Sequence, residues 1–184
     1  MKRVLLFFVF ILSIFLSSSV SHAKETGNQD TLEVKQATSA AIIEYNLAYP
    51  GILPDHPLYK LKVFRDKISA ALISDPNKKI DFYLLQTDKG ILASAMLVDK
   101  GKVDLAMETA LKAEHNYTLI SKEVEKISLT DDFSKKLHTA SLKHQEVLSS
   151  LAKRVSKEQA KTFLTVSDFS KRNWQTIEEY KAKL

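Results

Sequence analysis

Between residues 103 and 127, apolar side chains recur at steps that alternate strictly between three and four positions. The series is Val103, Ala106, Ala110, Ala113, Tyr117, Ile120, Val124 and Ile127. Because an α-helix has 3.6 residues per turn, this spacing gathers the apolar groups into one seam, as in helices that pack at a shallow angle. The alanines permit a close approach by a neighbour. This pattern predicts a helix inside a bundle.

Other stretches show helical spacing and recognisable ends. Asp75 can cap a helix that begins with a proline and ends at Gly101. Thr130 can cap a later helix, and Ser156 with Gln159 makes a capping box for the last one. The first helix has an apolar stripe on one face, made of Leu58, Leu61, Phe64, Ile68 and Leu72.

No stretch shows the alternation that a half-buried strand requires, and no Asn-Gly or Asp-Gly turn is present. The predicted fold is therefore all-α: an elongated antiparallel bundle of four to five helices, preceded by a Pro-rich extended segment.

Gly90 lies inside the second predicted helix. It either weakens that helix by up to about 1 kcal/mol or allows a close helix crossing, and the pattern does not decide between these.

The first 23 residues have the features of a secretory signal peptide. Two cations, Lys2 and Arg3, precede an apolar run over residues 4–16, and the small residues Ser21 and Ala23 follow. We expect cleavage near Ala23. The alternative is a retained anchor, but the run is shorter than the roughly 20 residues that span a bilayer. The expected location is secreted, periplasmic or in the cell envelope.

The predicted organisation has three parts: a signal peptide over 1–23, a flexible leader and Pro/Gly-rich lead-in segment over 24–55, and a helical-bundle domain over 56–184.

The whole chain contains no cysteine. Disulfides, thiolate metal sites, thiol nucleophiles and a lipid-modified cysteine are therefore excluded.

Three of the four prolines lie between residues 46 and 62. Pro50 and Gly51 fit a type II turn, in which Gly51 takes a positive φ. Pro57 is expected to open the first helix, with His56 or Asp55 at its cap. The predicted structural motif consists of Pro50, Gly51, Pro54, His56, Pro57, Leu58 and Tyr59, and its expected role is to aim the first helix.

The stretch from Pro50 to Lys62 has the pattern P-G-x-x-P-x-x-P-L-Y-x-L-K. Together with Asp75-Pro76-Asn77-Lys78-Lys79 and Lys100-Gly101-Lys102, it resembles a bacterial family of exported helical domains of unknown function. The resemblance covers residues 45–127 approximately. It implies an extracytoplasmic helical domain without an assigned reaction, substrate or catalytic residue. The second helix departs from the family's charged character.

Histidine is the residue type that most invites a metal or haem hypothesis. His144 lies on an apolar stripe, whereas His138, six positions earlier, faces another direction, so the two cannot chelate one ion. His144 is a weak metal candidate, and a hydrogen-bonded core histidine is the more frequent outcome. No nucleophile elbow, phosphate loop or metalloprotease motif is present. No cofactor is predicted, and enzymatic activity has no support.

Positive charge gathers near the C-terminal end. Residues 24–132 contain 14 Lys and Arg against 17 Asp and Glu, and residues 133–184 contain 11 against 5. A candidate interaction patch consists of Lys153, Arg154, Lys157, Lys161, Lys171, Arg172 and Trp174. It could dock an anionic envelope polymer or lipid headgroups, and the alternative is ordinary solvated charge. Without Lys2 and Arg3 the net charge falls from +5 to +3, so nucleic-acid binding is not expected.

The sequence thus favours a non-enzymatic extracytoplasmic helical domain that interacts with a protein or cell-envelope partner, including association with a membrane surface. The alternative is a bundle that binds a small ligand or a metal between its helices. The sequence does not determine the oligomeric state.

Overall fold

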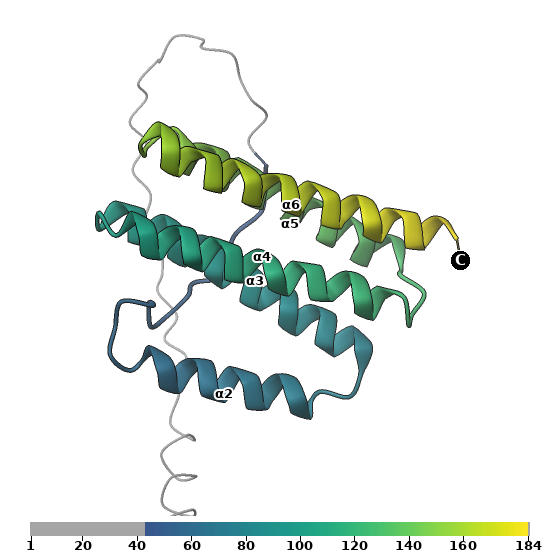
Figure 1. The fold of residues 1–184 in the computed structure, drawn as a ribbon. Coiled ribbons are helices and arrows are strands. Elements are labelled where there is room, and N and C mark those ends of the chain that lie inside the picture. Colours follow the sequence, from purple (N-terminus) through teal and green to yellow (C-terminus); the bar gives the residue numbers. More distant parts are fainter. Residues whose placement is uncertain (1–42, 184) are drawn as a thin grey trace, which may run out of the picture. The chain divides into compact units, whose positions relative to one another are not determined.

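The computed structural model describes residues 43–183 of the 184-residue chain. The expected signal peptide and the leader as far as residue 42 lie outside this range. Within it there are five helices and no strand: α2 (Tyr59–Leu72), α3 (Pro76–Asp99), α4 (Val103–Val124), α5 (Asp131–Ala152) and α6 (Lys157–Ala182) (Figure 1). The all-α bundle predicted from the sequence is confirmed.

The helix starts follow the capping residues read from the sequence. The Asp75 carboxylate accepts hydrogen bonds from the amides of Asn77 (2.8 Å) and Lys78 (3.2 Å). The Thr130 hydroxyl accepts one from the Phe133 amide, at 3.3 Å. At the start of α6 both halves of the capping box between Ser156 and Gln159 are formed. Backbone N–H groups at these helix starts are therefore satisfied locally.

The four long helices form two antiparallel hairpins that pack on each other. The α3–α4 hairpin contacts the α5–α6 hairpin mainly through α4 against α6 (Figure 1). Buried apolar residues make two clusters. One contains Ile91, Leu97, Leu148 and Phe163, and the other contains Ile80, Leu84, Tyr117, Leu137 and Ile177.

Gly90 lies where α3 crosses α4. A Cβ atom at this position would lie 2.5 Å from the Cβ of Ala113. Non-bonded carbon atoms do not approach so closely, so glycine is needed for the two backbones to meet. Of the two roles left open for Gly90, the structure supports the close crossing.

Helix α2 departs from the expected packing. Its apolar stripe lies on one face as predicted, but that face is exposed: Leu61 is 66 % exposed, Phe64 65 % and Leu72 77 %. No residue of α2 is buried. The apolar stripe predicted for the first helix therefore exists, but the bundle does not bury it. Periodicity shows which residues share a face, but it does not show which way that face points.

The start of α2 also differs from the prediction. The helix begins at Tyr59, two residues after Pro57, and its N-cap Leu58 supplies no side-chain hydrogen bond. The Leu58 amide donates to Nδ1 of His56 at 3.1 Å, which forms a turn ahead of the helix. Asp55 does not cap α2 because its carboxylate pairs with two lysines elsewhere, as described below.

Candidate functional site

The lead-in segment is tied to the turn between α3 and α4. The Asp55 carboxylate pairs with Nζ of Lys100 at 3.1 Å and Nζ of Lys102 at 2.9 Å. Hydrogen bonds from Lys102 and Lys100 hold the pKa of Asp55 below its usual value. Gly51 has φ +67°, as the predicted type II turn requires. Two motifs that are far apart in the sequence are therefore in direct contact.

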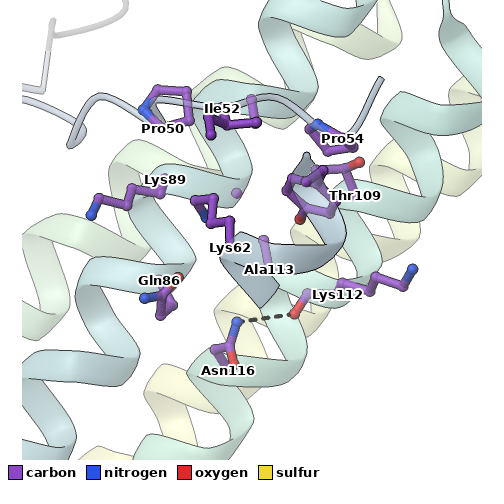
Figure 2. Close-up of a pocket in the computed structure, with 13 residues that line it drawn as sticks. Pro50, Ile52, Pro54, Lys62, Gln86, Lys89, Thr109, Lys112, Ala113 and Asn116 are labelled. Atoms are coloured by element: carbon purple, nitrogen blue, oxygen red, sulfur yellow. Dashed lines mark hydrogen bonds between the residues drawn. The ribbon is translucent and has the colours of Figure 1, made fainter. Parts of the chain in front are cut away.

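Pro50, Ile52 and Pro54 of this segment lie across the place where α3 meets α4 (Figure 2). The small pocket beneath them has a volume of about 70 Å³ and is also lined by Gly90 and Ala113. That is room for a few water molecules at most, since each takes about 30 Å³ in the liquid. The lead-in segment therefore packs on the scaffold, and the pocket directly beneath Pro50 and Ile52 is too small for a typical small-molecule ligand.

We call the outward-facing side of α2 the α2 outer face; it consists of Leu58, Leu61, Phe64, Ile68 and Leu72. These five side chains are between 45 % and 77 % exposed. Lys60 and Lys67 flank them on one edge, and Arg65 lies within the stripe, between the positions of Leu58 and Leu72 around the helix. The single acidic residue of the helix, Asp66, is half-buried on the opposite side and pairs with Lys62 at 3.2 Å. The outer face thus carries only apolar and basic groups apart from a few small side chains.

A groove lies beneath α2, against α3 and α4. Its volume is about 580 Å³, which is within the range of small-molecule sites. The apolar part of the wall includes Val63 and Ala70 of α2, Phe82 of α3, and Leu111 and Leu119 of α4. Lys62, Lys67, Lys112 and His115 add basic or imidazole side chains to the lining, and Asp66 adds one carboxylate, which pairs with Lys62.

His144 occupies the centre of the bundle, with no exposed surface. Its Nε2 forms a 2.8 Å hydrogen bond with Oδ1 of Asp88, and the hydroxyl of Tyr45 donates to Oδ2 of Asp88, also at 2.8 Å. Burial and the Asp88 carboxylate raise the pKa of Tyr45. The ring of Tyr117 meets the His144 ring edge to face, with centroids 5.6 Å apart. The prediction that His138 faces another direction is confirmed, because His138 stacks on Trp174 at the surface.

Glu114 is the second buried acid, with 1 % of its surface exposed. Asn173 donates to its Oε1 at 3.1 Å. Burial raises the pKa of Glu114 to about 7, although His144 and Asn173 oppose the shift. Within residues 43–183, Oε2 of Glu114 and Nδ1 of His144 have no hydrogen-bond partner. Two fully buried serines, Ser141 and Ser170, are hydrogen-bonded to each other nearby. We call Asp88, Glu114, Ser141, His144 and Ser170 the polar layer, because they lie between the two apolar clusters.

Asp88 and Glu114 are not among the residues predicted from the sequence. Asp88 follows the polar residue Thr87 within the second predicted helix, and Glu114 follows Ala113 of the apolar seam over residues 103–127. A charged residue directly beside a seam position was the only available signal. Among the described residues, no group of three or more His, Asp or Glu side chains is placed to hold a metal ion. Of the acidic residues in the described range, Asp88 is the one that is hydrogen-bonded to His144.

The residues of the predicted C-terminal patch lie in two different parts of the structure. Lys153, Lys157 and Lys161 lie exposed around the α5–α6 turn, where Lys161 pairs with Glu158 at 2.9 Å. Arg154 pairs with Asp99 of α3.

The other members of the patch lie further along α6. The guanidinium of Arg172 lies over the Phe169 ring, 4.8 Å from its centroid, and Lys171 beside it is exposed. Lys171 is roughly 20 Å along the helix axis from Lys157, at 1.5 Å per residue. The Trp174 ring stacks on His138, with centroids 4.5 Å apart, and is only partly exposed. These residues are brought together in two groups, not one.

In the part of the chain that the structure covers, no helix combines the length and apolar composition needed to cross a membrane.

The family model described as "Domain of unknown function (DUF5667)" matches residues 51–158, from the lead-in segment to the start of α6. No curated protein and no solved structure matches the chain.

Proposed function

The chain belongs to the family described as Domain of unknown function (DUF5667), and from this premise we propose that it is a non-enzymatic extracytoplasmic module that docks on a partner in the cell envelope. The docking surface in this proposal is the α2 outer face. The apolar run and small residues over 1–23 support export. The lead-in motif from Pro50 to Lys62 supports a bacterial origin through its resemblance to exported bacterial domains.

The observation that carries the proposal is the exposure of the α2 outer face. Helices α3 to α6 each bury apolar residues, whereas α2 buries none. Full burial of one Leu, Ile or Phe side chain contributes about 1.5–3 kcal/mol. Five such side chains are exposed together on α2, so their burial against a partner would contribute a large favourable free energy. Contiguous exposed apolar patches of this kind mark interaction sites.

The test is the distribution of the protein between the envelope fraction and the released fraction of the cells that make it. Leu61→Ser with Phe64→Ser removes apolar surface from the α2 outer face. Leu142→Ser with Leu164→Ser is the matched control, because these leucines are also exposed, on α5 and α6. We expect the wild type and the control in the envelope fraction and the α2 variant in the released fraction. An α2 variant distributed like the wild type would contradict the proposal.

The groove beneath α2 favours a second candidate function, the binding of a small amphipathic molecule. Its volume of about 580 Å³ and its apolar wall with cations at the margin suit a ligand that has an apolar body and an acidic end. Native mass spectrometry of the purified protein tests this candidate. A bound small molecule that is lost in Ala70→Phe, which fills the groove, would support it; the ligand-free mass alone would count against it.

A further inference from the structure

We propose that the α2 outer face binds the surface of an anionic lipid bilayer, with α2 lying parallel to the membrane plane. This inference rests on the proposed function and identifies the partner. The other possible occupants of the same face, a protein or an anionic envelope polymer, are outcomes of the test below.

The shape of the α2 outer face suits a flat surface. From Leu58 to Leu72 the five apolar side chains run for roughly 21 Å along the helix and fall within an arc of about 120° around it. Helix α2 lies at the edge of the bundle, with α3 and α4 on one side of it only (Figure 1). The side chains with the greatest exposure point away from those helices. A plane can therefore contact the whole stripe at once.

The charges around the stripe identify the kind of surface. Helix α2 has four basic residues, Lys60, Lys62, Arg65 and Lys67, and one acidic residue, Asp66. Asp66 lies on the inward side, where Lys62 and Arg65 pair with it. Lys60 and Lys67 are exposed along one edge of the stripe, and within residues 43–183 neither forms an ion pair. An apolar stripe edged by cations is the arrangement of helices that lie in the interface of an anionic membrane.

The same charges argue against a second copy of this chain as the occupant. In a symmetric dimer through the stripe, the Lys60 and Lys67 edge of one copy would lie beside either the same edge or the Arg65 side of the other copy, and neither outer face offers an acidic partner. Stable interfaces also bury about 800 Å² per partner, which is much for one face of a 14-residue helix. Anionic headgroups supply the missing negative charge, and the acyl region accepts the stripe.

Helix α2 is held at both ends, so binding does not require it to fold. Before it, the Asp55 ion pairs fix the lead-in segment to the α3–α4 turn. After it, three residues lead to the capped start of α3 at Pro76. A preformed helix presents its face without the ordering cost that an unstructured peptide meets at a membrane.

The experiment uses the absence of cysteine in the chain, which makes a single introduced thiol a unique labelling site. Leu61→Cys on α2 and Leu164→Cys on α6 are labelled with a polarity-sensitive fluorophore in otherwise identical protein. Leu164 is the matched control because it is also an exposed leucine, at 48 %. Each protein is mixed with vesicles of phosphatidylglycerol and phosphatidylcholine, and with vesicles of phosphatidylcholine alone. The readout is local to the labelled residue, so attachment through another part of the chain does not imitate it.

We expect a blue shift at position 61 with the anionic vesicles only, and none at position 164. Raising the salt concentration is expected to weaken the effect, since screening shortens the reach of exposed charges to about 8 Å at physiological ionic strength and to less above it. Equal responses at the two positions, or a response at position 61 that ignores lipid charge, would overturn the proposal.

Charge reversal locates the electrostatic part of the interaction. Lys60→Glu with Lys67→Glu is expected to weaken partition onto anionic vesicles by at least about tenfold. Lys153→Glu with Lys157→Glu makes the same change of charge at the α5–α6 turn and is expected to change partition by less than about twofold. All four lysines are exposed, and thermal unfolding of each variant verifies that it folds. Equal weakening by the two double variants would place the binding surface elsewhere and contradict the assignment to α2.

The outcomes separate this inference from the proposed function. If purified protein ignores anionic vesicles while the α2 variant still leaves the envelope fraction of cells, the lipid assignment fails and docking through α2 stands, with a protein or polymer as the partner. If the α2 variant stays in the envelope fraction, the proposed function itself fails.

Discussion

A single residue of the polar layer, Glu114, makes the stability of the bundle depend on pH. Glu114 is nearly fully buried, and its pKa rises from 4.5 to about 7 because burial disfavours the carboxylate. The folded chain therefore binds a proton that the unfolded chain releases between these pH values. Stability must fall as the pH rises through this window and then level off above it. The cost of ionising Glu114 is on the order of 3 kcal/mol.

The first prediction concerns Glu114→Gln, which keeps the shape of the side chain and removes its charge. The variant is expected to be more stable than the wild type at pH 8, by up to about 3 kcal/mol, and to differ little at pH 4.5. Urea unfolding across this pH range measures the difference. His144 of α5 and Asn173 of α6 face this carboxyl and are unchanged in the variant. Glu108→Gln, at an exposed position of α4, is the control and should keep the wild-type slope.

The second prediction concerns Gly90→Ala. The new methyl group would meet the Cβ of Ala113 at 2.5 Å, and neither group has a rotamer that relieves the contact. Overpacking of this kind costs about 1–3 kcal/mol, which exceeds the helix-propensity gain of up to about 1 kcal/mol. Chemical denaturation should therefore show a less stable protein. The added change Ala113→Gly makes room for the methyl group, and a double variant no better than Gly90→Ala would contradict the close-crossing explanation.

The elements differ in how far the sequence predicts them. Capping residues mark the starts of α3, α5 and α6 because the cap hydrogen bonds form within one helical turn. The orientation of α2 could not be predicted, since nothing local shows whether a stripe faces the core or the solvent. The role of Asp55 was missed for a related reason: its partners Lys100 and Lys102 are distant in the sequence, and only the fold brings them close.

The third prediction compares apolar residues of two elements. Phe64→Ser on α2 is expected to change the free energy of unfolding by no more than about 0.5 kcal/mol, because the side chain is exposed in the wild type. Leu84→Ala on α3 removes a side chain that is 2 % exposed, and is expected to cost about 2–5 kcal/mol. Comparable losses in the two variants would show that the α2 outer face is buried in solution.

At the scale of the whole molecule, the described residues combine a packed four-helix core with one helix outside it. The sequence predicted the bundle because helical spacing is repeated in every long segment. It did not predict the polar layer, in which Asp88, Glu114 and His144 come from three helices and meet only when those helices have packed. The candidate docking surface was likewise expected at the C-terminal cations, whereas the surface that we propose from the structure is the exposed apolar stripe of α2.

The fourth prediction concerns hydrogen exchange along the chain. Amides in α3 to α6 should exchange slowly, through opening of the packed core, whereas amides in α2 should exchange much faster because α2 buries no residue. Mass spectrometry of peptides from the exchanged protein resolves the two regions. With anionic vesicles present, protection confined to α2 is expected from the lipid proposal; uniform protection of all helices without vesicles would contradict the packing described above.

The attachments of the lead-in segment also determine how the molecule carries mechanical tension. The Ile43 amide donates to Glu146 of α5 at 3.3 Å, Tyr45 reaches Asp88 of α3, and Asp55 reaches the α3–α4 turn. All three attachments precede α2 in the chain. A pull on the chain ahead of residue 43 is therefore borne by α3, α5 and the α3–α4 turn, and it does not load α2 until these attachments break.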